Sequence, residues 1–212
     1  MSRIRHHVHS TKAHATSMAV WGAPTPVAIH SSFDVRLGVK CSAGCRLAGR
    51  WVKVSDEAGS NMGEGRLGDA PWPGTRGLYV AELTLPAPAI EDVFNWSGSF
   101  PGDKASPHEH AAVAFSFRTA KPPEHTVVVK VTDREAGEPL GGVELFMGIY
   151  RAATNAHGLA KFGLPKSTYE LTVRERDGEA PPMTVDVNGD TTVEIQAAPT
   201  PETSPDEKEL WM

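Results

Sequence analysis

Short runs that alternate apolar with polar residues constrain the fold of this chain most strongly. In the clearest run Phe33, Val35, Leu37 and Val39 alternate with polar or small residues. Successive side chains of a β-strand point to opposite faces, so a period of two predicts a half-buried strand with its apolar face on a core. The runs end at Gly, Pro, Asp, Asn or Ser, which are turn residues. The 20 Gly and 17 Pro fit many turns, and the pattern predicts an all-β chain.

The first half of the chain repeats the pattern several times. Its runs are MAVWG, FDVRLGVKC, RWVKVSD, GLYVAELTLPAP, VFNWSGSF and AAVAFSFRTA. Many short strands separated by turns are typical of a β-sandwich. Residues 18–120 are therefore expected to form one sandwich, which resembles bacterial immunoglobulin-like modules in its strand rhythm.

The segment TAKPPEH marks a domain boundary, because two adjacent prolines stiffen an extended linker. We place the linker at 121–125 and a second all-β domain at 126–197. Residues 198–212 are Pro-rich and acidic, and they predict a disordered tail. Residues 1–17 are polar and have no hydrophobic period, so a flexible arm is expected there.

The second half carries a family resemblance. The segments TVVVKVTDREAGEPLGGVELFMG and ATNAHGLAKFGLPKSTYELTV resemble carboxypeptidase regulatory-like domains, a transthyretin-like sandwich related to collagen-adhesin B-type repeats. The resemblance covers about a third of the chain. It implies a β-sandwich with an accessory or structural role, in which Gly158 allows the chain to reverse before the next strand.

Two activities of related families are not expected. Lys130 matches the lysine of the isopeptide bond that collagen-adhesin repeats form, but Val173 stands near the position of the required acid. The transthyretin-like hydrolases of the purine pathway end in Tyr-Arg-Gly-Ser, whereas this chain ends in ELWM.

Charge and hydrophobicity argue against nucleic-acid binding, a membrane span and secretion. The formal net charge of −5 and the scattered basic residues do not favour nucleic acid. No stretch approaches the roughly 18–20 apolar residues of a membrane span. The N-terminus lacks the apolar core of a secretory signal, so a cytoplasmic location is expected.

Histidines and cysteines offer a metal-site hypothesis. Cys41 and Cys45 lie in CSAGC, His108 and His110 in PHEHA, and further histidines are His6, His7, His9 and His157. Imidazoles and thiolates suit copper or nickel, but no single segment sets a closed coordination geometry, so no cofactor is assigned. The two cysteines are expected as thiols in a reducing compartment and as a disulfide in an oxidising one; the missing signal sequence favours thiols.

No catalytic motif is present. The chain lacks a nucleophile elbow, a phosphate-binding loop and a dinucleotide fingerprint, which predicts a protein that is not an enzyme. Trp72, between two prolines, forms either a cover of the sandwich or an interaction site. Leu210 and Trp211 in the acidic tail form a candidate docking motif.

The sequence therefore favours a non-catalytic accessory or scaffold protein that binds other proteins through tandem β-sandwich domains. The alternative is a carbohydrate- or metal-binding module, in which Trp72 acts with Trp51 or Trp96, or the histidines bind metal. Unpaired edge strands also leave room for a homo-oligomer.

Overall fold

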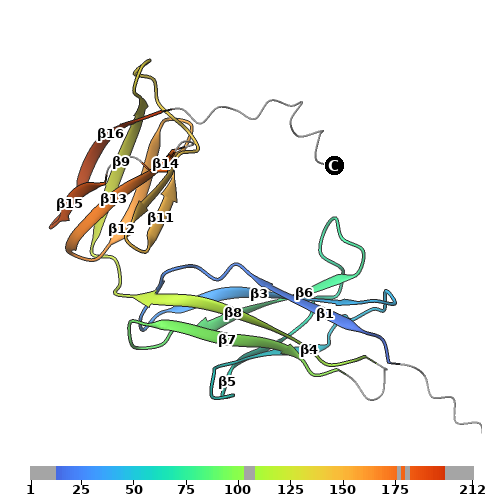
Figure 1. The fold of residues 1–212 in the computed structure, drawn as a ribbon. Coiled ribbons are helices and arrows are strands. Elements are labelled where there is room, and N and C mark those ends of the chain that lie inside the picture. Colours follow the sequence, from blue (N-terminus) through green and yellow to red (C-terminus); the bar gives the residue numbers. More distant parts are fainter. Residues whose placement is uncertain (1–12, 103–107, 176–177, 180–181, 199–212) are drawn as a thin grey trace, which may run out of the picture. The chain divides into compact units, whose positions relative to one another are not determined.

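The computed structural model describes residues 13–102, 108–175, 178–179 and 182–198. Contacts divide the chain into two compact units, Met1–Ala120 and Lys121–Met212. Every regular element in the described residues is a β-strand, which confirms the predicted all-β fold (Figure 1). In the same residues no helix is long and apolar enough to cross a membrane.

The first unit is a sandwich of two sheets. One sheet has the order β1-β3-β6 and the other β2-β8-β7-β4-β5. The strands are β1 (Thr16–Trp21), β2 (Val27–Ala28), β3 (Ser32–Cys41), β4 (Trp51–Ser55), β5 (Asn61–Arg66), β6 (Leu78–Pro86), β7 (Val93–Phe100) and β8 (Ala111–Ala120).

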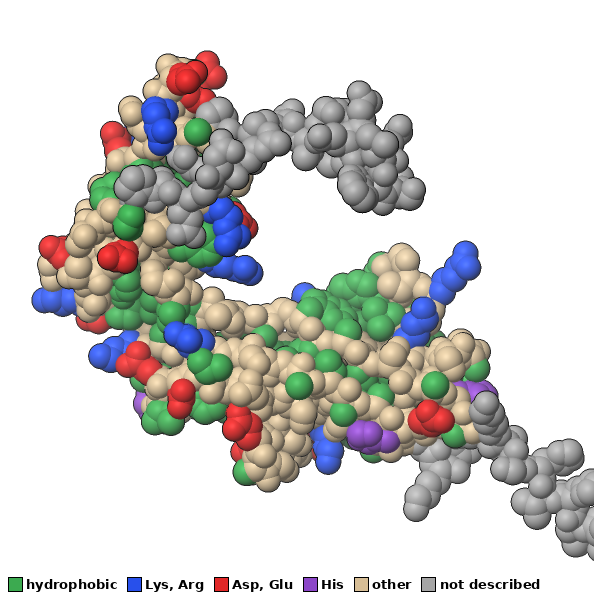
Figure 2. All heavy atoms as spheres, in the orientation of Figure 1, with side chains coloured by type: hydrophobic (Ala, Val, Ile, Leu, Met, Phe, Trp, Pro, Cys, Tyr) green, Lys and Arg blue, Asp and Glu red, His purple; other side chains and the backbone are tan. Residues whose placement is uncertain are grey.

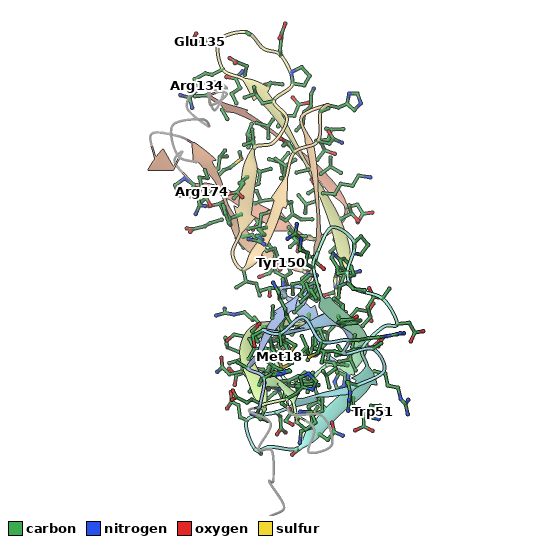
Figure 3. All side chains as sticks on the ribbon, turned by 90° about the vertical axis from the view of Figure 1, so that its right-hand side faces the viewer. Met18, Trp51, Arg134, Glu135, Tyr150 and Arg174 are labelled. Carbon is green, nitrogen blue, oxygen red and sulfur yellow. The ribbon has the colours of Figure 1, made fainter. Side chains whose placement is uncertain are left out.

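The core of the first unit lies between its two sheets. The predicted inner face of β3 is buried, from Phe33 at 4% exposed to Leu37 and Val39 at 0%. Phe33 packs on Trp96 of β7 and Phe117 of β8, with ring centroids 5.9 and 4.8 Å apart. Figure 3 shows Met18 inside this unit and Trp51 at its margin. The alternation in β3 therefore determines which of its side chains pack in the core between the two sheets.

The predicted flexible arm, residues 1–17, is wrong at its C-terminal end. Thr16 and Ser17 belong to β1, where they pair with Cys41 and Lys40 of β3. Met18 and Val20 of β1 pack on the core, so this strand follows the same alternation as β3. Residues 1–12 lie outside the described residues.

The second unit is also a sandwich. One sheet has the order β11-β10-β13-β14, with β15 also paired to β13, and the other has the order β12-β9-β16. The strands are β9 (His125–Asp133), β10 (Glu144–Met147), β11 (Tyr150–Ala153), β12 (Leu159–Leu164), β13 (Ser167–Glu175), β14 (Gly178–Glu179), β15 (Met183–Val187) and β16 (Thr191–Ala197). Its core includes Val129, Leu145, Phe162 and Val187, all at most 3% exposed.

The TNAHG segment of the second unit forms the turn before β12, and two of its residues fix the turn's conformation. The side chain of Asn155 accepts hydrogen bonds from the backbone N–H groups of His157 and Leu159, at 2.9 and 3.1 Å. Gly158 has a φ of +69°, and a Cβ there would collide with the carbonyl oxygen of Val131. Both residues fix the chain reversal, as the sequence predicted for Gly158.

Charged side chains are spread over the face seen in Figure 2, in both units. Several charged side chains of the described residues form cross-strand pairs, such as Arg36 with Glu82 at 2.8 Å. Lys130, the residue at the isopeptide position of related repeats, contacts Glu194 at 3.2 Å and is 44% exposed at its side chain. Exposed pairs of this kind contribute little to stability.

Candidate metal centre

Two cysteines meet at one end of the first sandwich because of the alternation in β3. Phe33, Val35, Leu37 and Val39 point into the core, and Cys41, the last residue of the strand, continues this series and is 1% exposed. The chain then turns, with the Gly44 N–H donating to the Cys41 carbonyl at 3.1 Å. Cys45 thereby returns beside Cys41, and both are free cysteines.

Two histidines reach the same place from distant parts of the sequence. His14 and His108 form an isolated β-bridge, and the Glu109 N–H donates to the His14 carbonyl at 3.0 Å. The Ser42 N–H donates to the Ala15 carbonyl at 2.9 Å, which joins the same segment to the end of β3. The backbone therefore holds all three segments together independently of the side chains.

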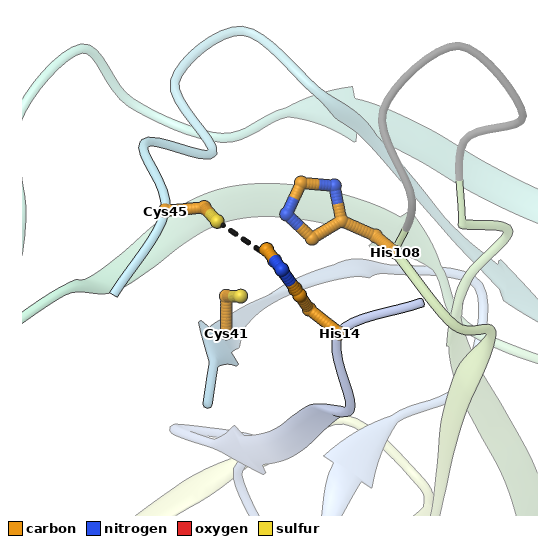
Figure 4. A group of neighbouring side chains, drawn as sticks. All are labelled: His14, Cys41, Cys45 and His108. Atoms are coloured by element: carbon orange, nitrogen blue, oxygen red, sulfur yellow. Dashed lines mark hydrogen bonds between the residues drawn. The ribbon is translucent and has the colours of Figure 1, made fainter. Parts of the chain in front are cut away.

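The four side chains form one compact group (Figure 4). The nearest ligand atoms of His14, Cys41, Cys45 and His108 all lie within 4.8 Å of one another. His14 Nδ1 is 3.1 Å from Cys45 Sγ, and the two imidazole rings meet edge to face with centroids 5.9 Å apart. Two sulfur and two nitrogen donors at this spacing can surround a single metal ion.

The surroundings shift the pKa values of the two thiols in opposite directions. Burial raises the pKa of Cys41, but the backbone N–H groups of Cys45, Ala43 and Gly44 and the Cys45 thiol outweigh it and lower that pKa overall. The hydrogen bond to Cys41 raises the pKa of Cys45. Cys41 is therefore the better thiolate, which is the form that binds metals.

His108 is buried without a hydrogen-bond partner for its ring. It is 7% exposed, and neither Nδ1 nor Nε2 has a partner among the described residues. Burial, together with the positive charge of Arg50 and the nearby His14, lowers the pKa of His108. The ring is thus neutral at neutral pH and presents a lone pair, as metal binding requires.

The structure brings together three of the four residues of the predicted metal alternative. Cys41, Cys45 and His108 belong to the group, whereas His110 is exposed and outside it. His110 is two residues after His108, but β8 begins at Ala111 and His110 stays at the surface. The prediction that His110 belongs to the metal-binding group was therefore wrong.

His14 is the member that sequence reasoning missed. The polar character of residues 1–17 predicts a flexible arm and gives His14 no role. The alternation of Val20, Met18 and Thr16, which are all half-buried, extends back to His14 on the same face. That period of two was the available signal.

Trp72 is held in a turn on the outer face of the β1-β3-β6 sheet. The Thr75 N–H donates to the Trp72 carbonyl at 3.0 Å, and Gly74 has a φ of +77°, as in a type II turn. The ring packs edge to face on Trp21, with centroids 5.9 Å apart, and the Arg36 guanidinium lies 5.6 Å from its centroid. Trp72 remains 37% exposed, so it both covers the sheet and offers a surface.

The proposed partners of Trp72 in a carbohydrate platform are elsewhere. Trp96 is 3% exposed in the core, and that expectation was wrong. Trp51 is 47% exposed on β4, in the other sheet, where its ring meets the Arg66 guanidinium at 4.7 Å. Leu210 and Trp211 of the predicted docking motif, and His6, His7 and His9, lie outside the described residues.

Comparisons with known proteins identify no family for this chain. The chain matches no protein-family model, and no curated protein matches it significantly. A CARDB domain from Pyrococcus furiosus aligns with 52% of this chain and 98% of its own length, at 13% identity and a TM-score of 0.39. The major pilin subunit BcpA of Bacillus cereus aligns over 87% of this chain and 70% of its own, at 10% identity and a TM-score of 0.30.

A minor pilin of Streptococcus agalactiae gives a similar result, covering 91% of this chain and 98% of its own at 12% identity and a TM-score of 0.27. Likenesses of this size establish neither a family nor an activity. No function of this chain follows from these neighbours.

Proposed function

We propose that the first unit binds one zinc ion through His14, Cys41, Cys45 and His108, and that the ion has a structural role. The observation that carries this proposal is the convergence of the four donor atoms within 4.8 Å. Tetrahedral sites with two sulfur and two nitrogen ligands are typical of zinc.

The buried ring of His108 supports a bound ion. A buried polar atom without a partner costs about 1–3 kcal/mol, and native proteins contain few of them. Coordination through one ring nitrogen of His108 would provide the partner that the described residues lack. Cys41 adds support, because the surrounding N–H groups lower the pKa of its thiol and so ease formation of the thiolate that zinc binds.

The ligand count supports a structural role over a catalytic one. Catalytic zinc keeps a coordination position open for water or substrate, whereas structural zinc is enclosed by four protein ligands. Here the four ligands would join the segment before β1, the end of β3 and its following loop, and the segment before β8. Zinc would thus stabilise one end of the sandwich by cross-linking these segments.

Zinc titration of the full-length reduced chain tests the proposal. We expect one equivalent to bind, and His108→Ala to weaken binding by more than about 100-fold, because even residues that only orient a ligand contribute about 10–100-fold. His110→Ala is the matched control, since His110 lies two residues away at the surface, and it should leave binding unchanged. Equal binding by both variants would contradict the proposal, as would tight binding of Cu(I) with none of zinc.

A protein-interaction role is the second candidate, and Trp72 favours it. The turn fixes this partly exposed ring, so a partner that packs on it would cost little side-chain entropy. Affinity purification with the full chain and with Trp72→Ala tests this role. A stoichiometric partner that the variant loses supports it, and an unchanged set of partners contradicts it.

For the second unit we also propose membership of the carboxypeptidase regulatory-like family. The support is local, since Asn155 and Gly158 of the resembling segment both shape the turn before β12. An accessory role would follow from such membership, in line with a zinc site that is structural.

A further inference from the structure

Cys41 and Cys45 are placed to react with each other. They are the two cysteines of the chain, and both are free thiols. Their sulfur atoms lie within 4.8 Å of each other. A disulfide needs an S–S distance of about 2.05 Å. Because the two sulfurs are already within 4.8 Å and belong to one five-residue segment, the reaction requires only a rearrangement of the short loop between them.

The surroundings give the two thiols different roles. Cys41 is 1% exposed, so its sulfur is shielded from solvent. Cys45 is more open to solvent, so a dissolved oxidant reaches it first. His14 Nδ1, at 3.1 Å from Cys45 Sγ, can accept the proton of that thiol.

We propose that Cys45 is a site of oxidation by hydroperoxides, and that Cys41 attacks the oxidised sulfur to form a disulfide that removes two of the four zinc ligands. The release of zinc depends on the proposed function of this site. The formation of the disulfide does not depend on it.

The chemistry balances in two steps. In the first, the Cys45 thiolate attacks one oxygen of the hydroperoxide, the O–O bond breaks, and Cys45 becomes a sulfenic acid. In the zinc-free chain the leaving alkoxide, or hydroxide from hydrogen peroxide, takes the proton that His14 accepted. In the zinc-loaded chain, where His14 and Cys45 would be ligands, it takes a proton from water. In the second step the Cys41 thiolate attacks the Cys45 sulfur, the S–O bond breaks, and hydroxide leaves to be protonated as water. Two thiols are oxidised, and one peroxide is reduced.

The test treats the full-length reduced chain, zinc-loaded and zinc-free, with one equivalent of hydrogen peroxide. The expected result is complete loss of free thiols, an intact mass lower by two hydrogen atoms, and release of one zinc per disulfide to a chromogenic chelator. Dithiothreitol should restore both the thiols and zinc binding. Thiols that survive while free glutathione is consumed would overturn the proposal, as would zinc release with both thiols intact.

Three variants separate this proposal from the zinc proposal. Cys41→Ser should stop at the sulfenic acid of Cys45, which dimedone traps, and Cys45→Ser should lose the reaction at low peroxide. His108→Ala lacks a zinc ligand but keeps both thiols, so it should still form the disulfide. If the unsubstituted chain forms the disulfide but binds no zinc when zinc is added, only the zinc site is refuted. If it binds zinc but its thiols resist peroxide both with and without zinc, only the oxidation site is refuted.

Discussion

At the scale of single residues, the fold of the second unit requires a glycine at position 158. Its φ of +69° is one that residues with a Cβ rarely adopt, and a Cβ would also collide with the Val131 carbonyl. We expect Gly158→Ala to lower the free energy of unfolding of this unit by about 2 kcal/mol or more. Urea unfolding followed by circular dichroism measures this.

Gly137→Ala is the control for that prediction. Gly137 has nearly the same φ, +71°, but open space where a Cβ would lie. Its substitution should cost only the conformational strain, about 1 kcal/mol. Equal losses for the two variants would show that the contact with Val131 has no energetic weight.

Asp133 makes the stability of the second unit depend on pH. Its carboxylate accepts hydrogen bonds from the N–H groups of Ala136 and Glu135, at 3.0 and 2.6 Å, and these lower the pKa of Asp133 below its ordinary value. A lowered folded-state pKa stabilises the protein above the ordinary value and loses this effect as pH falls through the folded-state pKa.

We therefore expect Asp133→Asn to be less stable than the parent chain at neutral pH, and the difference to shrink as the pH falls through the acidic range. Urea midpoints across that range measure the effect. A difference that stays constant with pH would show that the carboxylate charge contributes nothing.

At this scale, the sequence predicted part of the candidate site. Cys41 and Cys45 were recognised as a close pair, because spacing along the chain is visible directly. Their meeting with His14 and His108 depends on the pairing of β1 with β3 and on the bridge between residues 14 and 108. Long-range register of this kind is not encoded in any local pattern, so the four-residue site was out of reach.

At the scale of elements, strands whose sequences alternate apolar and polar residues were predicted, and a strand without this alternation was not. β3 and β8 match their predicted runs, whereas β5 was not predicted, since its sequence NMGEGR has no apolar alternation. Gly63 and Gly65 of β5 lie against Leu85 and Leu83 of β6, where a Cβ would come within 2.6 and 3.0 Å. The larger side chains of β6 occupy that space, so β5 is recognisable only from its partners.

Zinc should stabilise one element in particular. The segment that carries His14 continues directly into β1, and Ser42 and Glu109 bond to its backbone. We expect zinc to slow hydrogen exchange in β1 and at those two amides, because opening of this end would then break metal bonds. Mass-spectrometric exchange with and without zinc measures this.

His110→Ala should show the same protection as the parent chain, and strands of the second unit should exchange equally with and without zinc. Protection spread evenly over all strands, or absent from β1 at saturating zinc, would contradict a site at this end of the first sandwich.

At the scale of the whole molecule, the two units have separate cores, and we expect them to unfold separately. Zinc at 100 times its Kd should stabilise the first unit by about 2.7 kcal/mol and leave the second unchanged. Leu37→Ala, at a fully buried position, should destabilise only the first unit, by about 3–5 kcal/mol. Scanning calorimetry resolves the two transitions, and a single transition that shifts as one would contradict independent units.

The central claim concerns the four ligands of one metal ion, and X-ray absorption at the zinc edge tests it most directly. For the zinc-loaded, reduced full-length chain, the account predicts two sulfur neighbours at about 2.3 Å and two imidazole nitrogens at about 2.0–2.1 Å. A zinc shell of nitrogen and oxygen alone would contradict it, because Cys41 and Cys45 would then not be ligands.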